Sequence, residues 1–345
     1  MTVAPALPPL SVLDLVTVSE DATTASAIAD SKRLVDAADR LGYRRYWVAE
    51  HHNTELVAST SPAVLLAHLG QGTERIRLGS GGVMLPNHSP LIVAEQFQLL
   101  EAMFPGRIDL GLGRAPGTDP ITAAAVRGSL GQRSVEDFPQ HVVEVLGLVG
   151  ERRPEHDADW LRRIRATPAP AEGVAPEVWV LGSSLFGAEL AAALGLPYAY
   201  ANHFGMGANP VSPVEHYRRH YTPSERWPEP KVLMSASVIV AEDMEEARRL
   251  ALPSRIASWE IRMGRPKRVL SPEHAAETAA RIVDRELFNR IPGTQLLGPA
   301  AQVARQLAEL AERTGADELL LAATTYDIQT RIDTLEALAP YLPAE

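Results

Sequence analysis

Short apolar runs rich in β-branched residues alternate along the chain with segments in which apolar residues recur every three or four positions. The short runs have the length and composition of buried strands. The wider spacing is typical of helices with one apolar face, as at Ile28, Leu34, Val35, Ala38 and Leu41. The pattern predicts eight strands, over residues 10–18, 44–51, 75–84, 107–113, 177–182, 197–203, 232–240 and 317–324.

Helical segments follow the predicted strands, and the strands are apolar throughout instead of alternating with polar residues. Both features indicate a parallel sheet that is covered by helices. Eight strand–helix units close a TIM (β/α)8 barrel. This α/β fold is the one that we expect for residues 1–345, as a single domain. An open, doubly wound parallel sheet is the alternative.

Two stretches interrupt the regular pattern. Residues 150–176 are rich in proline and arginine and predict a long connection. Residues 252–298 hold several prolines and short helical patterns after the seventh strand. Long excursions of this kind are uncommon in compact domains and often form lids over active sites. We therefore predict a mobile lid at 252–298, inserted between strands seven and eight.

The composition narrows the functional classes. Lys and Arg number 33 against 43 Asp and Glu, and the net charge of -10 disfavours a nucleic-acid or anionic-membrane surface. The absence of cysteine excludes disulfides, thiolate metal sites and thiol nucleophiles. No apolar run is long enough to span a bilayer, and the N-terminus does not resemble a signal peptide. We expect a cytoplasmic protein.

Active sites of parallel barrels lie at the carboxyl ends of the strands, and the second strand ends in Glu50, His51 and His52. Adjacent strand residues point to opposite sides, so the two histidines do not favour one shared metal. No metal-binding spacing such as His-Glu-x-x-His occurs either. One imidazole could serve as a general base or hydrogen-bond donor. A structural Glu–His pair at the strand end is the equally good alternative.

Glycines mark the ends of the third and fourth strands. Gly81 and Gly82 allow a flat ligand to approach the backbone, or they form a bulge that bends the strand. Gly113 and Arg114 lie in a glycine pattern that lacks the βαβ unit and the acidic residue of a Rossmann dinucleotide site. Arg114 suits a phosphate or an anionic ring, and a plain surface arginine is the alternative.

Ser183 and Ser184 precede a helix predicted from Phe186 to Leu194. Hydroxyls and free amides at a helix start form an anion site, although simple capping is the commoner role. A serine hydrolase lacks its Gly-x-Ser-x-Gly turn, and a glycosidase or two-metal enzyme lacks carboxylates beyond Glu50. The predicted rim therefore suits a large planar anionic cofactor better than a metal.

Four segments carry a resemblance to a known family: residues 46–53 (YWVAEHHN), 75–97, 106–117 (GRIDLGLGRAPG) and 181–204. They resemble the bacterial luciferase-like monooxygenase family, and the resemblance extends from about residue 10 to 340. It is closest to the single-chain members. The resemblance implies a TIM barrel that binds FMN at its top, with reduced FMN supplied by a separate flavin reductase and O2 as the second substrate.

The resemblance also implies roles for individual residues. His51, preceded by Glu50, would lie near the isoalloxazine ring and assist the chemistry of a C4a-peroxyflavin. Arg114 and the residues around Ser183 would hold the phosphate, and the Gly81–Gly82 peptide would be cis beneath the ring. The full set of implied cofactor-binding residues is Gly81, Gly82, Gly113, Arg114, Ser183, Ser184, Gly187 and Asn202. Luciferases of the family carry a reactive cysteine at the position of Gly113, so we do not expect light emission.

The resemblance implies oxidation of a small organic substrate, such as an aldehyde, by a homodimer that associates through residues 61–72 and 90–104. A deazaflavin-dependent dehydrogenase or reductase on the same barrel is the nearest alternative. A non-catalytic flavin-binding protein and an unrelated metal-dependent hydrolase are two more. We expect no metal, no membrane and no nucleic acid among the partners.

Overall fold

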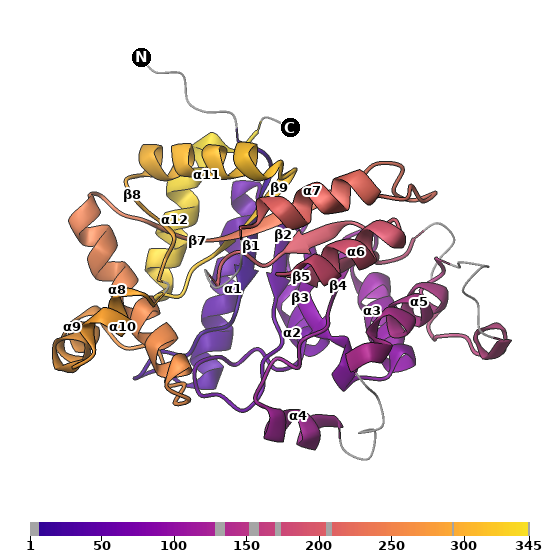
Figure 1. The fold of residues 1–345 in the computed structure, drawn as a ribbon, viewed down its shortest axis with the longest axis horizontal. Coiled ribbons are helices and arrows are strands. Elements are labelled where there is room, and N and C mark those ends of the chain that lie inside the picture. Colours follow the sequence, from indigo (N-terminus) through magenta and orange to yellow (C-terminus); the bar gives the residue numbers. More distant parts are fainter. Residues whose placement is uncertain are drawn as a thin grey trace.

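The computed structural model describes residues 7–127, 135–151, 159–169, 174–204, 209–291 and 293–343. Strands β1 to β7 follow one another around a parallel sheet, and β9 pairs with both β7 and β1 to close it (Figure 1). The closed eight-stranded barrel confirms the TIM-barrel prediction, and the open-sheet alternative is wrong. The eight barrel strands are β1 (Leu10–Asp14), β2 (Arg45–Val48), β3 (Arg77–Met84), β4 (Ile108–Gly113), β5 (Glu177–Gly182), β6 (Tyr198–Tyr200), β7 (Val232–Val240) and β9 (Glu318–Ala322).

The helices form a layer around this barrel (Figure 1). They begin where the sequence offers start signals, such as Ser or Asp before the helix and Pro in its first turn. Their bounds are α1 Thr24–Leu41, α2 Pro62–Leu69, α3 Pro90–Met103, α4 Pro120–Arg127, α5 Phe138–Leu148, α6 Leu185–Ala193, α7 Val211–His220, α8 Met244–Arg262, α9 Pro272–Arg281, α10 Arg285–Asn289, α11 Ala300–Thr314 and α12 Ile328–Leu338. Within the described residues, no helix is both long and apolar enough to cross a membrane.

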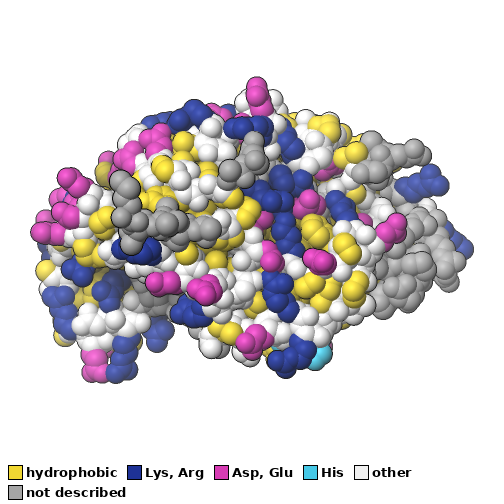
Figure 2. All heavy atoms as spheres, turned by 90° about the horizontal axis from the view of Figure 1, so that it is seen from above, with side chains coloured by type: hydrophobic (Ala, Val, Ile, Leu, Met, Phe, Trp, Pro, Cys, Tyr) yellow, Lys and Arg dark blue, Asp and Glu magenta, His cyan; other side chains and the backbone are white. Residues whose placement is uncertain are grey.

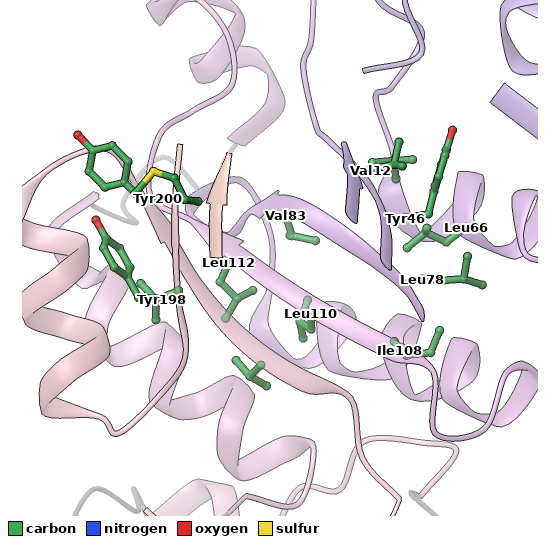
Figure 3. Close-up of a cluster of buried hydrophobic side chains, with 14 of the residues drawn as sticks. Val12, Tyr46, Leu66, Leu78, Val83, Ile108, Leu110, Leu112, Tyr198 and Tyr200 are labelled. Atoms are coloured by element: carbon green, nitrogen blue, oxygen red, sulfur yellow. The ribbon is translucent and has the colours of Figure 1, made fainter. Parts of the chain in front are cut away.

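Side chains on the outer face of the barrel form the main hydrophobic core. Leu78 on β3 and Ile108, Leu110 and Leu112 on β4 are fully buried against the surrounding helices (Figure 3). Successive strand residues point to opposite faces, so the residues between these positions face the barrel interior. Burial of the outer set holds the helices on the barrel.

Side chains fill the interior of the barrel in layers, and the first layer lies at the end at which the strands begin. Arg45 is completely buried there, and its guanidinium donates to Asp109 Oδ2 at 2.8 Å and to Glu318 Oε1 at 2.8 Å. Arg77 donates to the other oxygen of Asp109 at 2.7 Å. Figure 2 shows this end of the molecule, where Lys and Arg side chains gather near the middle with Asp and Glu beside them.

A second inner layer lies above the charged one. Trp47 and Trp179 meet edge to face, with ring centroids 5.5 Å apart, and pack among Leu13, Leu233 and Leu320. The Trp47 indole also donates to Asp109 Oδ2 at 2.9 Å, which ties this layer to the charged one. The two indoles fill the middle of the barrel and form the floor beneath its carboxyl-end mouth.

The excursion between β7 and β9 comprises the second half of α8, helices α9 and α10, and a short strand, β8 (Leu296–Gly298). It has a hydrophobic cluster of its own, centred on Trp259 and Phe288. Val269 also exchanges backbone hydrogen bonds of 2.9 Å with Val18 and Glu20 beside the mouth. The predicted lid segment therefore lies at the mouth, while its mobility stays a prediction.

Two details differ from the sequence-based picture. The pattern missed β8, because three residues are too few to show a strand period. Part of the predicted connection at 150–176 lies outside the described residues. Its described portion includes a short 3-10 helix, Asp159–Arg162.

Replacement of Arg45 by methionine tests the charged layer. The variant keeps an apolar stem but leaves Asp109 and Glu318 with one cation fewer, and burial of an uncompensated charge costs about 3–5 kcal/mol. Urea unfolding should show a loss of that size in the free energy of unfolding. Arg40→Met removes an exposed ion pair to Glu336 and should cost at most about 1 kcal/mol. Equal losses in the two variants would contradict the role given to the buried layer.

Candidate active site

A cavity of about 210 Å³ opens at the carboxyl ends of the strands. Residues from β2 to β6 and the loops after them form most of its wall, together with Leu15 after β1 and Phe138 on α5. The structure brings eight of the predicted site residues together there, and they are His51, Gly81, Gly82, Gly113, Arg114, Ser183, Ser184 and Gly187.

Two histidines face this cavity. His51 follows β2, and its backbone amide donates to the carbonyl of Ser59 at 2.9 Å. His203 follows β6. His51 Nδ1 and His203 Nε2 are both buried and have no hydrogen-bond partner among the described residues. A buried polar atom without a partner is costly, so each nitrogen is suited to a ligand that completes it.

Both imidazoles are held neutral. Burial lowers the pKa of His51 below its ordinary value, although the carboxylate of Glu50 acts in the opposite direction. Burial, together with the nearby His51, lowers the pKa of His203 to about 3. At neutral pH the cavity therefore presents two uncharged imidazoles that can each exchange a proton or a hydrogen bond.

Glu50 lies outside this cavity, which the sequence did not indicate. Its side chain is fully buried, and its oxygens contact His52 Nε2 at 2.9 Å and His88 Nε2 at 2.8 Å. It also accepts a hydrogen bond of 2.9 Å from the backbone amide of Met84. Burial raises the pKa of Glu50, but these hydrogen bonds outweigh it and lower the pKa overall. Glu50 therefore joins the ends of β2 and β3 and holds the segment that carries His51.

Arg114 and the start of α6 form the opposite end of the cavity. The Arg114 guanidinium lies 3.9 Å from the ring centroid of Phe186, in the first turn of α6. It donates no hydrogen bond to another residue in the described part of the chain. The aromatic face thus holds the cation beside the helix N-terminus and leaves its N–H groups for a ligand.

The serines before α6 are arranged for an anion. Ser184 is the N-cap of α6 and has an extended backbone, yet its side chain makes no capping hydrogen bond. The carbonyls of Ser183 and Ser184 accept hydrogen bonds from Tyr200 and Tyr198, at 3.2 and 3.1 Å. These bonds fix the turn while both serines stay exposed. Free amides and hydroxyls at a helix N-terminus favour a phosphate.

Glycines form the surface between these two ends. The peptide bond between Gly81 and Gly82 is cis, as the resemblance implies. A Cβ atom on Gly82 would lie 2.7 Å from the carbonyl oxygen of Gly111, and one on Gly113 would lie 3.0 Å from Met84 Sδ. Backbone without side chains therefore lines the cavity along β3 and β4, where a flat ring can approach closely.

Asn202 is the second predicted residue that does not line the cavity. Its carbonyl accepts a hydrogen bond of 2.6 Å from Gln295 Nε2 in the excursion, and its side-chain amide also faces Gln295. The neighbouring Ala201 and His203 line the cavity instead. The two-residue period of β6, which points Ala199 inward, could have identified His203. The sequence analysis also missed Phe138 and Phe186, which lie on helices.

A wider cleft of about 950 Å³ adjoins the cavity, and Leu15, His51 and Phe204 line both. The excursion contributes Ile261 and Arg265 to the wall of the cleft. The cleft therefore offers a small molecule a route from solvent to His51. No group of three or more metal-ligating side chains occurs among the residues that the structure describes.

The model of a family described as luciferase-like monooxygenase matches residues 9–323. The chain belongs to the luciferase-like monooxygenase family. A luciferase-like monooxygenase of Escherichia coli K12 is 36% identical over 94% of both chains. The N-acetyl-S-alkylcysteine monooxygenase of Bacillus subtilis is 35% identical over 77% of this chain and 78% of its own length. Membership of this family supports an oxidoreductase that acts on a small molecule.

Solved structures agree with the fold. The crystal structure of apo-MsnO8 covers 99% of both chains with a TM-score of 0.87 and 32% identity. The oxygenating component of 3,6-diketocamphane monooxygenase from Pseudomonas putida, solved with FMN, has a TM-score of 0.67, 18% identity and coverage of 97% and 98%. An F420-dependent secondary alcohol dehydrogenase, solved with an F420-acetone adduct, has a TM-score of 0.68, 16% identity and coverage of 98% and 100%. These last two likenesses concern the fold alone.

The lowered pKa of His203 predicts a loss of stability in acid. The unfolded chain takes up a proton on this histidine below about pH 6.5, whereas the folded chain does so only near pH 3. Stability should therefore fall as the pH drops from 7 to 5, by roughly 2 kcal/mol from His203. Urea unfolding at the two pH values should show a correspondingly smaller loss in His203→Phe.

The matched control is His220→Phe, on the exposed end of α7. It should keep the acid dependence of the wild type. An acid dependence in His203→Phe equal to that of the wild type would show that His203 is not held neutral.

Proposed function

We propose that this protein is an FMN-dependent monooxygenase, which uses reduced flavin and O2 to oxidise a small organic substrate of the aldehyde type. One observation carries the proposal. A single cavity joins a helix start suited to an anion, a wall of glycine backbone and two neutral imidazoles, each with a nitrogen that lacks a partner among the described residues. The helix start would bind a phosphate, the glycine backbone would face a planar ring, and the imidazoles would lie at the reacting centre.

The residues fit a flavin phosphate at the end formed by Arg114, Ser183, Ser184 and the N-terminus of α6. The guanidinium adds a positive charge to the positive end of the helix dipole. Gly187 packs against Gly182, with 3.4 Å from a Cβ at Gly187 to the Cα of Gly182, which brings the first turn of α6 close to β5. This packing sets the helix amides at the edge of the cavity.

The ring would lie along Gly81, Gly82 and Gly113, above the floor that Trp47 and Trp179 form. Reduced FMN supplies the electrons with which one atom of O2 enters the substrate while the other leaves as water. His51 borders both the cavity and the cleft, so its neutral imidazole can take up or return a proton where substrate and ring meet. Glu50 keeps His51 in place through His52 and Met84.

The excursion would exclude water from the reacting centre. Ile261 and Phe204 present apolar side chains to the cleft, and both are about half exposed, at 53% and 46%. A bound substrate would cover these surfaces and would itself be shielded from solvent. Their apolar character favours a substrate with a hydrocarbon portion.

A deazaflavin-dependent dehydrogenase is the second candidate, because a protein of the same fold was solved with F420. That activity would transfer hydride and would not incorporate oxygen. The anion site and the glycine surface would suit either cofactor. The two candidate functions therefore differ in the reaction, which is oxygen transfer in one and hydride transfer in the other.

Oxygen transfer tests the proposal directly. Reduced FMN is mixed with ¹⁸O2, the protein and a panel of aldehydes, ketones and thioethers, and the products are examined by mass spectrometry. We expect one ¹⁸O atom in each product molecule. His51→Phe should lower the yield of product about 100-fold or more, since a positioned proton-transfer group contributes that much. Hydride transfer from reduced F420 without any ¹⁸O incorporation would establish the second candidate instead.

Arg114→Ala tests the phosphate end separately from the ring. Loss of a charge-assisted contact should weaken the binding of FMN roughly 10- to 100-fold, while riboflavin, which lacks the phosphate, should bind as it does to the wild type. Anaerobic titrations with each reduced flavin measure both affinities. Arg262→Ala is the matched control, since Arg262 is an exposed arginine that does not line the cavity. A weaker affinity for both flavins in Arg114→Ala would contradict the assignment.

We also propose that two copies associate through α2 and α3, with a separate reductase supplying the flavin. Four large apolar side chains are exposed on these helices, namely Val64, Ile92, Leu99 and Met103, at 68%, 49%, 54% and 43%. A second copy is the occupant that the family resemblance implies for this surface.

Val64→Asp with Leu99→Asp should convert a dimer to a monomer in light scattering after size-exclusion chromatography. Val283→Asp, at a 96% exposed position in the excursion, should leave the dimer intact, and a wild-type monomer would refute the proposal.

A further inference from the structure

His203 lines the cavity and carries a nitrogen atom to which no other described residue forms a hydrogen bond. Its Nε2 is buried and has no hydrogen-bond partner among the described residues. The residue lines the inner cavity together with Gly81, Gly113 and Ser183, but it does not line the outer cleft. The inner cavity is therefore the space, of the two that the site comprises, from which a bound group can approach this imidazole.

The orientation of the imidazole is fixed from two sides. Nδ1 lies 2.7 Å from Ser235 Oγ, and this hydroxyl also accepts hydrogen bonds from the backbone amides of Asn202 and His203, at 2.9 and 3.2 Å. Ser235 is itself buried on β7. The ring of Phe204 packs against the imidazole, with centroids 4.0 Å apart. Ser235 on the neighbouring strand thus engages Nδ1, and Nε2, across the ring from it, stays without a partner among the described residues.

His51 and His203 follow β2 and β6, which are four strands apart in the closed ring, and the two imidazoles nevertheless lie close enough for His51 to contribute to the lowered pKa of His203. His51 borders the cleft as well as the cavity, whereas His203 borders the cavity alone. Only His51 therefore borders both spaces. A cofactor in the inner cavity and a substrate in the cleft would meet at His51, and His203 would lie beside the cofactor.

We propose that His203 Nε2 forms a hydrogen bond to a polar atom on the edge of the ring cofactor, with Ser235 as the positioning residue. This inference rests on the proposed function, since it requires a heteroaromatic ring in the cavity. It gives His203 the ring contact that the resemblance implied for Asn202.

The test asks whether His203 contributes to the binding of the flavin ring or to the binding of its phosphate. Reduced FMN and reduced riboflavin are titrated anaerobically into the wild-type protein and into His203→Phe, which keeps a flat ring but has no polar atom. The affinity for both flavins should fall by about 5- to 50-fold, and by the same factor, because the contact is to the ring they share. His203→Gln, which retains a polar side-chain amide near the Nε2 position, should recover part of the affinity. Ser235→Ala should weaken both flavins less than His203→Phe does.

His220→Phe is the control for the chemical change and should bind both flavins as the wild type does. Circular dichroism and thermal unfolding establish that each variant is folded, and Ser235→Ala and His203→Gln still test the contact if His203→Phe does not fold. Unchanged binding of both flavins to folded His203 variants would overturn the inference. So would a loss in Asn202→Ala that His203→Phe does not share.

The wild-type titration separates this inference from the proposed function. If the wild type binds reduced F420 and not reduced FMN, the monooxygenase proposal fails. The affinity of His203→Phe for reduced F420, divided by that of the wild type, then decides the role of His203. If the wild type binds neither ring, both proposals fail.

Discussion

The site depends on how the interior of the barrel is filled beneath it. Arg45 and its carboxylates occupy the first inner layer, and Trp47 and Trp179 occupy the second. Glycine at position 79 makes this possible, because a Cβ there would lie 2.5 Å from Trp47 Nε1. Beyond the indoles, small residues line much of the cavity, namely Ala49, Gly81, Gly113 and Ala201, and Leu15 and Leu181 pack against the indole cluster. The cavity therefore lies above a floor of packed indole rings.

Much of the fold could be predicted from the sequence. The eight apolar runs correspond to the eight barrel strands, because both faces of a parallel barrel strand are buried and the runs are consequently continuous. The sequence pattern did not predict the network of charged side chains inside the barrel. Arg45, Asp109, Glu177 and Glu318 lie far apart in the chain, and only closure of the ring turns four isolated charges at strand starts into one network.

The candidate site was predictable wherever backbone position decides function. Gly81, Gly82, Ser183 and Ser184 lie at strand ends and line the cavity. Side-chain direction explains why two predicted residues, Glu50 and Asn202, do not line the cavity. Glu50 turns outward to His52, His88 and Met84, and Asn202 faces the excursion, whereas the inward residue of that pair of neighbours is His203. Direction at the ends of short strands depends on tertiary contacts such as Ser235 and Gln295, which local sequence does not specify.

The central claim is that one cavity orients a flavin from its phosphate to its ring. A crystal structure of the protein with bound FMN tests this most directly. We predict that the phosphate lies between Arg114 and the N-terminus of α6, that the ring lies on the Gly81–Gly82 peptide, and that its polar edge is directed towards His203. Density for FMN at another surface, or in this cavity with the phosphate beside the histidines, would contradict the account.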